Sequence, residues 1–258
     1  MLSEVKTGVP IALSNSRYSR IWMFYFLISI IWVGGIAAYF VALPCLVLGR
    51  FFRPLWFVGG IVLKNGVDFL MKSQPWYQLQ TDVDLPQWKN FRAGYLTFSN
   101  HRSHLDMFIL LTKIQNIRVV TKSALYKIPF LNIMLWALQN FPVKKGDKKS
   151  YLGAMEKMVE AIKKGDPVHL FPEMTRCEKG FSGIQAFHLF PFHVAMKAQV
   201  PMIPFLFKGT DHVWPKGVSG IAYGKKMSLI QLPAIHPKDF SSAEQLRDHC
   251  WKVLQEAY

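Results

Sequence analysis

The sequence predicts an α/β protein in which a mostly parallel sheet is flanked by helices, with an apolar, membrane-associated helical element at the N-terminus. Short apolar runs alternate with amphipathic segments from about residue 76, and strands separated by helices favour parallel pairing. Hydrophobic residues make up 51% of the chain and charged residues only 18%, below the roughly 25% typical of soluble proteins. This composition indicates a protein that faces a membrane.

The N-terminal part divides into a polar lead, residues 1–20, and a membrane-associated helical segment, residues 21–70. No charged residue occurs between positions 21 and 48, and this run exceeds the roughly 20 residues that cross a bilayer as a helix. A single span and an anchor lying in the membrane both remain open, because Gly34, Gly35 and Pro44 interrupt the run. A cleaved signal peptide and a buried core helix fit the run less well.

Charge and cysteine content narrow the partners and the location. The net charge of +15 suits anionic lipid headgroups or acidic substrates, and the apolar composition favours lipid over nucleic acid. Cys45, Cys177 and Cys250 are scattered, so they predict neither a disulfide framework nor a metal site. We expect a protein of the inner or cytoplasmic membrane, with its active site facing the reducing cytoplasm and no nucleic acid partner.

Residues 76–258 form the predicted catalytic domain. Buried strands are expected at residues 95–98, 118–120, 141–143, 168–171 and 202–207. Pro142 and Pro204 favour strand starts or edge positions for the strands that contain them, because proline donates no backbone hydrogen bond.

Two helices of this domain have clear sequence signals. One shows an apolar face and is ended by a Gly-Asp-Pro sequence at residues 165–167, and the last helix begins at a capping box of Ser241 and Glu244. The predicted apolar faces consist of Leu152, Met155, Val159 and Ile162 in the first helix, and Leu246, Cys250, Val253 and Leu254 in the second.

Polar residues follow the expected strands. Parallel sheets bind ligands at the carboxyl ends of their strands, so these residues should meet at one edge of the sheet. In chain order they are His101 and Asp106, Lys122, Lys144 and Lys145, Glu173 with Thr175 and Arg176, and Lys208 with Asp211.

The pair His101 and Asp106 suits general-base catalysis. An imidazole can take the proton of a substrate hydroxyl near neutral pH, and a carboxylate on its other nitrogen fixes the tautomer and stabilises the imidazolium. Positions five apart on a helix point away from each other, so contact requires His101 to lie in the loop or the first helical turn. Ser99 or Asn100 would then cap that turn.

Each polar group also has a simpler interpretation. A histidine five residues before an aspartate arises easily by chance, and His101, His104 and Asp106 as metal ligands match no familiar zinc spacing, so we expect no metal. Arg176 suits bidentate phosphate binding, or a structural pair with Glu173. The basic turn at Lys144 and Lys145 is either a solvated loop or a phosphate contact.

Four blocks in order resemble the glycerophospholipid acyltransferase superfamily, most closely the bacterial 1-acyl-sn-glycerol-3-phosphate acyltransferases. The blocks are Asn-His-Arg-Ser-His-Leu-Asp (100–106), Asn-Phe-Pro-Val-Lys-Lys (140–145), Phe-Pro-Glu-Met-Thr-Arg (171–176) and Val-Pro-Met-Ile-Pro (200–204). The chain departs from the family pattern at Met174, where glycine is usual, and at Lys144 and Lys145, where arginine is usual.

The resemblance implies that His101 is the general base and Asp106 its partner. It implies an acceptor site lined by Glu173, Thr175 and Arg176, with Arg176 and either Lys144 or Lys145 on the acceptor phosphate. The implied reaction moves an acyl group from acyl-coenzyme A or acyl carrier protein, as co-substrate without a bound cofactor, to lysophosphatidic acid. Another lyso-lipid acceptor and a non-catalytic lipid-binding protein on the same scaffold are the alternatives.

Overall fold

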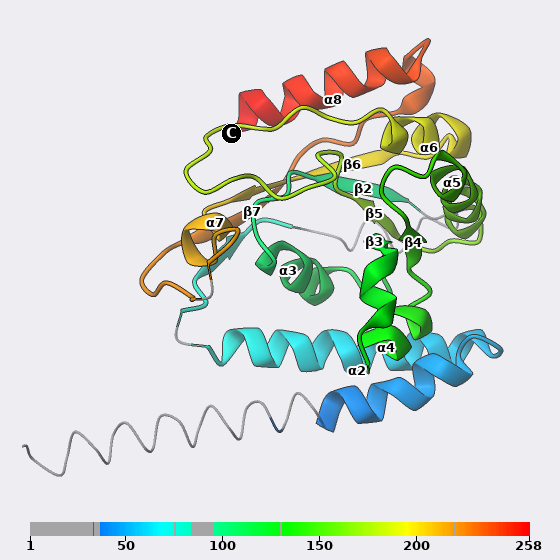
Figure 1. The fold of residues 1–258 in the computed structure, drawn as a ribbon, viewed down its shortest axis with the longest axis vertical. Helices are drawn as coiled ribbons and strands as arrows, with labels where there is room; N and C mark the ends of the chain where they lie inside the picture. Colours follow the sequence, from blue (N-terminus) through cyan, green and yellow to red (C-terminus); the bar gives the residue numbers. More distant parts are fainter. Residues whose placement is uncertain (1–32, 34–36, 75, 84–94, 130, 219) are drawn as a thin grey trace, which may run out of the picture.

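The computed structural model describes residues 33, 37–74, 76–83, 95–129, 131–218 and 220–258. The strands of this part of the chain form one sheet (Figure 1). Neighbouring strands run parallel, except that the second and third strands in the order given next are antiparallel to each other. That order is β1 (Leu79–Thr81), β7 (Met227–Gln231), β6 (Met202–Lys208), β2 (Leu96–Ser99), β5 (Val168–Leu170), β3 (Arg118–Lys122) and β4 (Phe141–Val143).

The predicted α/β class with a mostly parallel sheet is confirmed, and all five expected strands are present. The strands β1 and β7 were not predicted. β1 has only three residues, and none of them is buried. β7 runs antiparallel to β6. The alternation of strand, helix and strand along the chain predicts only parallel strands, so it did not predict β7.

The prediction of edge or starting positions holds for one of the two strand prolines and fails for the other. Pro142 lies in β4 at the edge of the sheet, as predicted, whereas the prediction for Pro204 is wrong, because β6 lies between β2 and β7. The carbonyl of Pro204 accepts a hydrogen bond from Leu232 (3.0 Å), so this residue's backbone polar groups face the β7 side of the strand. The ladder between β6 and β2 therefore loses no donor to the proline.

Helices cover both faces of the sheet (Figure 1). Side chains of β6 alternate between the two layers, as the two-residue period of a strand requires. Met202 and Leu206 pack on one side with α5 (Lys148–Lys163), α6 (Phe190–Ala198) and α8 (Ala243–Ala257), and Phe205 packs on the other with α3 (Leu105–Lys113). The shorter elements are η2 (Ser123–Lys127), α4 (Leu131–Ala137), α7 (Thr210–Val213) and η3 (Pro237–Asp239).

Two helix predictions need correction. The predicted face of α5 is wrong at Leu152, which is 47% exposed, because the buried stripe runs through Met158, Val159 and Ile162 instead. The N-cap of α8 is Ser242, whose side chain accepts a hydrogen bond from the backbone N–H of Gln245, so the helix starts one residue later than predicted. The buried face of α8 is confirmed at Leu246, Cys250 and Leu254.

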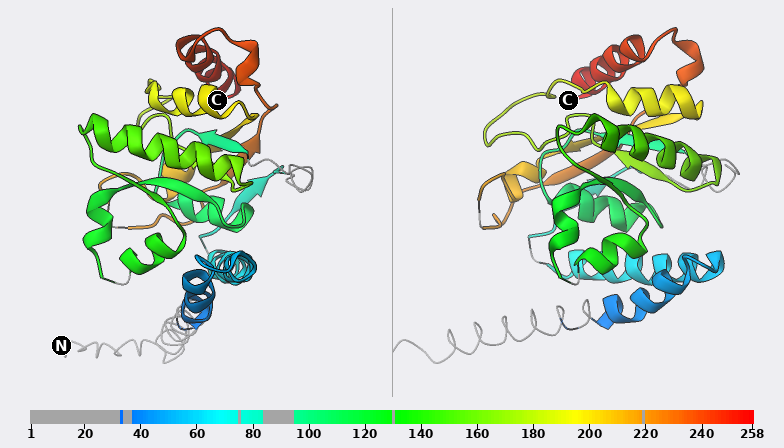
Figure 2. Two further views of the ribbon diagram at one scale, coloured as in Figure 1. Left: turned by 90° about the vertical axis from the view of Figure 1, so that its right-hand side faces the viewer. Right: turned by 45° about the vertical axis from the view of Figure 1, so that its right-hand side comes forward.

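The described N-terminal part contains helical residues 37–48 and α2 (Arg53–Lys72), which lie side by side beneath the sheet in both views of Figure 2. A Cβ added at Gly59 would lie 2.7 Å from Cγ of Leu46, and one at Gly60 would lie 2.1 Å from Oδ1 of Asn116. Glycine is therefore required for the close packing of α2 on its neighbours.

The predicted lead at residues 1–20 and most of the run at 21–36 lie outside the described residues. Among the helices that the structure describes, none combines the length and the apolar character that a bilayer span needs. The turn before α2 and the outer face of this helix nevertheless expose large hydrophobic side chains, namely Phe51, Phe52, Phe57, Val58, Ile61 and Phe69.

Candidate active site

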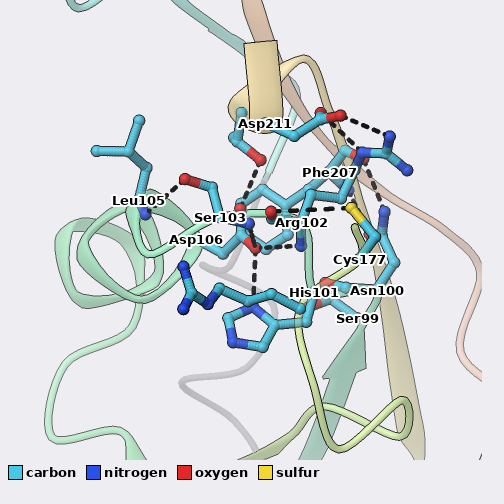
Figure 3. Close-up of polar contacts among 12 residues, drawn as sticks. Ser99, Asn100, His101, Arg102, Ser103, Leu105, Asp106, Cys177, Phe207 and Asp211 are labelled. Carbon is cyan, nitrogen blue, oxygen red and sulfur yellow. Dashed lines mark hydrogen bonds and ion pairs between the residues drawn. The ribbon is translucent and has the colours of Figure 1, made fainter. Parts of the chain in front are cut away.

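The segment between β2 and α3 brings His101 and Asp106 into contact. His101 lies in the loop and Asp106 in the first turn of α3, with Nδ1 of the imidazole 2.9 Å from Oδ2 of the carboxylate (Figure 3). This is the placement that contact over five residues requires. The hydrogen bond uses Nδ1 and leaves Nε2, the other ring nitrogen, for a substrate.

Asp106 is fully buried, and donors surround its carboxylate. The backbone N–H groups of Arg102 and Ser103 donate to Oδ2 at 2.7 and 2.8 Å, and the hydroxyl of Thr210 donates to Oδ1 at 2.6 Å. Burying a carboxylate is costly unless hydrogen bonds replace its water. These three donors, together with His101, satisfy that requirement and fix the carboxylate in place.

Aromatic packing fixes the plane of the imidazole. Phe171, directly after β5, stacks on His101 with ring centroids 3.9 Å apart and planes 21° apart. The side chain of His101 keeps 18% of its surface exposed, so a substrate can reach it. The ring thus has one nitrogen held by Asp106, one face covered by Phe171, and a remaining edge open to solvent.

The predicted cap of α3 is wrong. The N-cap position is His104, which makes no capping hydrogen bond with its side chain. Asn100 instead bonds to strand β6: its amide nitrogen donates to the carbonyl of Phe207 (2.9 Å) and its amide oxygen accepts from the N–H of Phe207 (2.8 Å). It thereby continues the ladder between β2 and β6, and Ser99 bonds to His169 of β5 (3.2 Å).

Arg102, between the two candidate catalytic residues, is a buried structural residue that sequence reasoning missed. Its guanidinium forms a bidentate pair with Asp211 of α7 at 2.8 and 2.7 Å (Figure 3). Burial raises the pKa of Asp211, but the hydrogen bonds and charge of Arg102 outweigh this and lower it. Arg102 also donates to the carbonyls of Phe181 and Gly183, so it ties the His101 loop to α7 and to the segment after β5.

Glu173 lies beside the loop of His101 and is only 3% exposed. Burial raises the pKa of its carboxyl group from 4.5 to about 7, although hydrogen bonds from the Gln185 side chain and from the backbone of His101 oppose the shift. The N–H of Cys177 donates to the carbonyl of His101 (2.9 Å) and makes a second link between these two segments. The geometry favours Glu173 as a residue that holds the loop over one that contacts a headgroup.

Met174 adopts a left-handed backbone conformation, with φ of 55°. Glycine adopts this conformation without the steric penalty that a side chain brings. The backbone at this position is therefore strained, and the methionine side chain is half-buried next to Glu173.

The remaining predicted substrate residues lie at different distances from His101. Burial lowers the pKa of His104, and the positive charges of Arg176 and Lys122 lower it further. These two cations therefore lie near the site. Within the described chain, the guanidinium of Arg176 has no hydrogen-bond or ion-pair partner. Thr175 is exposed, and its hydroxyl lies 3.5 Å from the carbonyl of Arg176.

Lys144 and Lys145 are exposed at the end of β4. They share the carboxyl edge of the sheet with His101, as predicted, but β5 and β3 separate β4 from β2. At a strand spacing of about 4.8 Å, they lie about 14 Å from the end of β2 along the sheet. The structure does not bring them into contact with the His101 loop.

His169 in β5 is a further residue that sequence reasoning missed. Its Nδ1 lies 2.8 Å from the hydroxyl of Thr97, and its Nε2 lies 3.2 Å from that of Ser99, both on β2. Burial and the nearby His101 lower the pKa of His169 to about 3, so the imidazole is neutral at pH 7. The signal in the sequence is a single histidine inside an otherwise apolar strand.

The metal-site alternative finds no support in the geometry. The ring of His104 lies against Trp214, with centroids 5.3 Å apart. Over the residues with described positions, no three side chains of histidine, cysteine, aspartate or glutamate are grouped as a metal ion would need.

The chain is similar in sequence to known acyltransferases. The model of a family described as Acyltransferase matches residues 79–208. A chloroplast 1-acyl-sn-glycerol-3-phosphate acyltransferase of Brassica napus is 33% identical over 136 residues, which are 52% of this chain and 39% of the relative. An enzyme of the same name from Haemophilus influenzae is 28% identical over 140 residues, 54% of this chain and 58% of the relative. The chain thus matches about two fifths to three fifths of the length of these relatives.

The crystal structure of the 1-acyl-sn-glycerophosphate acyltransferase of Thermotoga maritima has the same fold. It superimposes with a TM-score of 0.65 at 22% identity and covers 87% of this chain and 93% of the other.

Proposed function

Because this chain belongs to the acyltransferase family, we propose that it transfers a fatty acyl group from an acyl thioester to the free hydroxyl of a lysophospholipid. The acceptor that we propose is 1-acyl-sn-glycerol-3-phosphate, and the product is phosphatidic acid. The names of the relatives and the four ordered blocks support this acceptor. The observation that carries the proposal is the 2.9 Å contact between Nδ1 of His101 and the buried Asp106, which leaves Nε2 for the acceptor.

In the proposed reaction, Nε2 of His101 takes the proton of the acceptor hydroxyl as its oxygen attacks the thioester carbonyl. An ester C–O bond forms, the C–S bond breaks, and the thiolate leaves with the proton that His101 returns. Asp106 stabilises the imidazolium between these two transfers. The nucleophile belongs to the substrate, so the protein needs no covalent intermediate.

Arg176 is the residue that we propose for the acceptor phosphate, since its guanidinium has no partner among the described side chains and suits bidentate binding. Lys122 and Thr175 would add contacts at the same place. Lys144 and Lys145 would contact a more distant part of the substrates, because β4 is the edge strand. Glu173 would position the loop of His101.

The thioester donor is acyl-coenzyme A or acyl carrier protein, and the net charge of +15 suits either anionic donor. No bound cofactor or metal takes part in the proposed mechanism. We also propose that the chain associates with the cytoplasmic membrane through its N-terminal segment, at residues 21–70. The exposed Phe51, Phe52 and Phe69 on and before α2 support this association.

Acceptor choice has a second candidate. Met174 favours another lysophospholipid as the acceptor, because its side chain lies in the block at residues 171–176, at a position where the family has glycine. A panel of lysophosphatidic acid, lysophosphatidylcholine and monoacylglycerol would separate the two. Turnover of monoacylglycerol, which has no phosphate, as fast as that of lysophosphatidic acid would contradict the role that we propose for Arg176.

The test of the function is acyl transfer by the purified full chain in detergent, with acyl-coenzyme A and acyl carrier protein as alternative donors. His101→Ala should lose turnover by about 1,000-fold or more. The matched control is His104→Ala, which removes the exposed neighbouring imidazole and should retain most activity. Full activity of His101→Ala would exclude the proposed base, and no turnover by the unmodified chain with any acceptor of the panel would favour a lipid-binding protein.

A further inference from the structure

A second polar site lies at the opposite edge of the sheet from His101. It is a cavity of about 340 Å³ between the turn that precedes α2 and the amino ends of β3, β4 and β5. In Figure 1 this turn is at the right-hand end of α2, whereas α7, which follows the carboxyl end of β6, is at the left. The cavity is lined by Arg50, Arg53, Arg118, Lys157 and Lys164, with Glu160 and Asp166 as its carboxylates.

The cations of this cavity outnumber its carboxylates. Asp166 is shared by Arg53 (2.8 Å) and Arg118 (2.9 Å), and its side chain is 5% exposed. Glu160 of α5 pairs with Lys164, the residue directly after that helix, at 2.6 Å.

Two cations of this cavity have no carboxylate partner in the part of the chain that the structure describes. Arg50 donates to the carbonyl of Trp136 (2.9 Å) and stacks on that indole at 4.3 Å, which holds the guanidinium in place without neutralising it. Lys157 is exposed and has no ion-pair or hydrogen-bond partner among the described residues. The cavity therefore has positive charge available for an anion.

The surroundings of the cavity favour a lipid anion over a soluble one. Phe51, which also lines the cavity, is 87% exposed, and its neighbour Phe52 is 59% exposed. Large aromatic side chains are costly to leave in water, and they continue into the exposed apolar face of α2. Cations beside exposed aromatics are suited to the boundary between headgroups and acyl chains of a membrane.

We infer that this cavity binds the phosphate group of an anionic phospholipid, with Lys157 and Arg50 as the main charge partners and Phe51 and Phe52 against the acyl chains. The lipid is a component of the membrane and not the acyl acceptor, because β5 has this cavity at its amino end and the His101 site at its carboxyl end. The inference does not depend on the proposed acyl transfer.

The test uses thermal unfolding of the full chain in micelles of a neutral detergent, with phosphatidylglycerol, phosphatidylcholine or inorganic phosphate added. A ligand that binds the folded state raises the unfolding midpoint as its concentration increases. We expect phosphatidylglycerol to raise the midpoint more than the other two additives. Lys157→Gln should need about fivefold more phosphatidylglycerol for the same shift, the factor that matches about 1 kcal/mol per basic residue near anionic lipid.

The matched control is Lys163→Gln, which removes the same charge from an exposed position of the same helix outside the cavity, and it should respond as the unmodified chain does. Arg50→Gln combined with Lys157→Gln should weaken the response further. Arg176→Gln should keep it, which separates this site from the acceptor site.

An equal loss in Lys163→Gln would show diffuse surface charge and overturn the site. Equal shifts of the unfolding midpoint with phosphatidylglycerol and phosphatidylcholine would show that the negative charge of the lipid is not recognised, and would overturn the inference. A shift with inorganic phosphate as large as with phosphatidylglycerol would assign the cavity to a soluble phosphate and overturn the lipid. These outcomes leave the acyl-transfer assay unaffected, so the two proposals fail separately.

Discussion

The hydroxyl of Thr210 donates a 2.6 Å hydrogen bond to Oδ1 of Asp106, across 104 residues of sequence. Both groups are fully buried. The bond joins α7, which follows β6, to the first turn of α3, which follows β2. The orientation of the proposed catalytic carboxylate therefore depends on the pairing of two neighbouring strands.

Thr210→Val should lower both stability and turnover. The substitution keeps the shape of the side chain but leaves a buried carboxylate oxygen without a donor, which costs about 1–3 kcal/mol. We expect kcat to fall with little change in the KM of the acceptor, since Asp106 contacts His101 and not the substrate. Thr210→Ser keeps the hydroxyl and should restore most of both quantities, measured by denaturant unfolding and steady-state kinetics. A valine variant as stable and active as the unmodified chain would contradict the prediction.

The pKa of Glu173, raised by burial from 4.5 to about 7, predicts a pH dependence of stability. The folded protein binds this proton more tightly than the unfolded chain, so the contribution is complete below pH 4.5 and is lost as the pH rises through about 7. The shift corresponds to about 3 kcal/mol.

Glu173→Gln should abolish that part of the pH dependence, because the amide does not titrate. The measurement is the difference in unfolding free energy between the unmodified chain and the variant from pH 4 to pH 8, approximately the range over which the carboxyl group titrates. The control Glu256→Gln makes the same change at an exposed position of α8 and should leave the pH dependence in place. A constant difference for Glu173→Gln would disprove the buried titration.

Met174→Gly should stabilise the fold by about 0.5–1 kcal/mol. The gain is the relief of a left-handed conformation at φ of 55°, reduced by the larger conformational entropy of glycine in the unfolded chain. Met174→Ala is the matched control: it shortens the side chain but keeps the strained backbone, so it should bring no such gain. The acceptor preferences of the two variants then separate the effect of side-chain size from that of backbone strain. A change that both variants share would come from the lost side chain.

Gly60→Ala should destabilise the packing of α2 by about 1–3 kcal/mol, because the new methyl group would lie 2.1 Å from Oδ1 of Asn116. Asn116 is buried, and its amide donates to the carbonyl of Trp56 (2.8 Å), so it is not free to move aside. At Gly153 on α5, no described atom outside the adjoining helix backbone lies within 4 Å of an added Cβ, so Gly153→Ala should stabilise its helix by up to about 1 kcal/mol. Equal changes in the unfolding midpoint would show that the contact at Gly60 is relieved without cost.

Local patterns sufficed for much of the fold. The five predicted strands are short apolar runs. The C-terminal end of α5 follows from the Gly-Asp-Pro sequence after it, and the buried face of α8 follows from helical spacing, and both signals act over a few positions. Patterns failed where a neighbour in space decided the outcome. Pro204 sits in an interior strand because its missing N–H faces β7, and Leu152 is exposed because α5 turns a different stripe toward the sheet.

The sequence by itself determined the order of the five predicted strands. It also placed His101 in the loop at the carboxyl end of a strand and Asp106 in the residues that follow, since hydrophobic periodicity and turn residues are local. Only the tertiary structure decided which distant groups complete the site. The contacts of Thr210 with Asp106 and of Arg102 with Asp211 span more than 100 residues, and the lateral distance of Lys144 and Lys145 depends on strand order. Such contacts are set by which strands hydrogen-bond side by side, and no spacing along the chain encodes that choice.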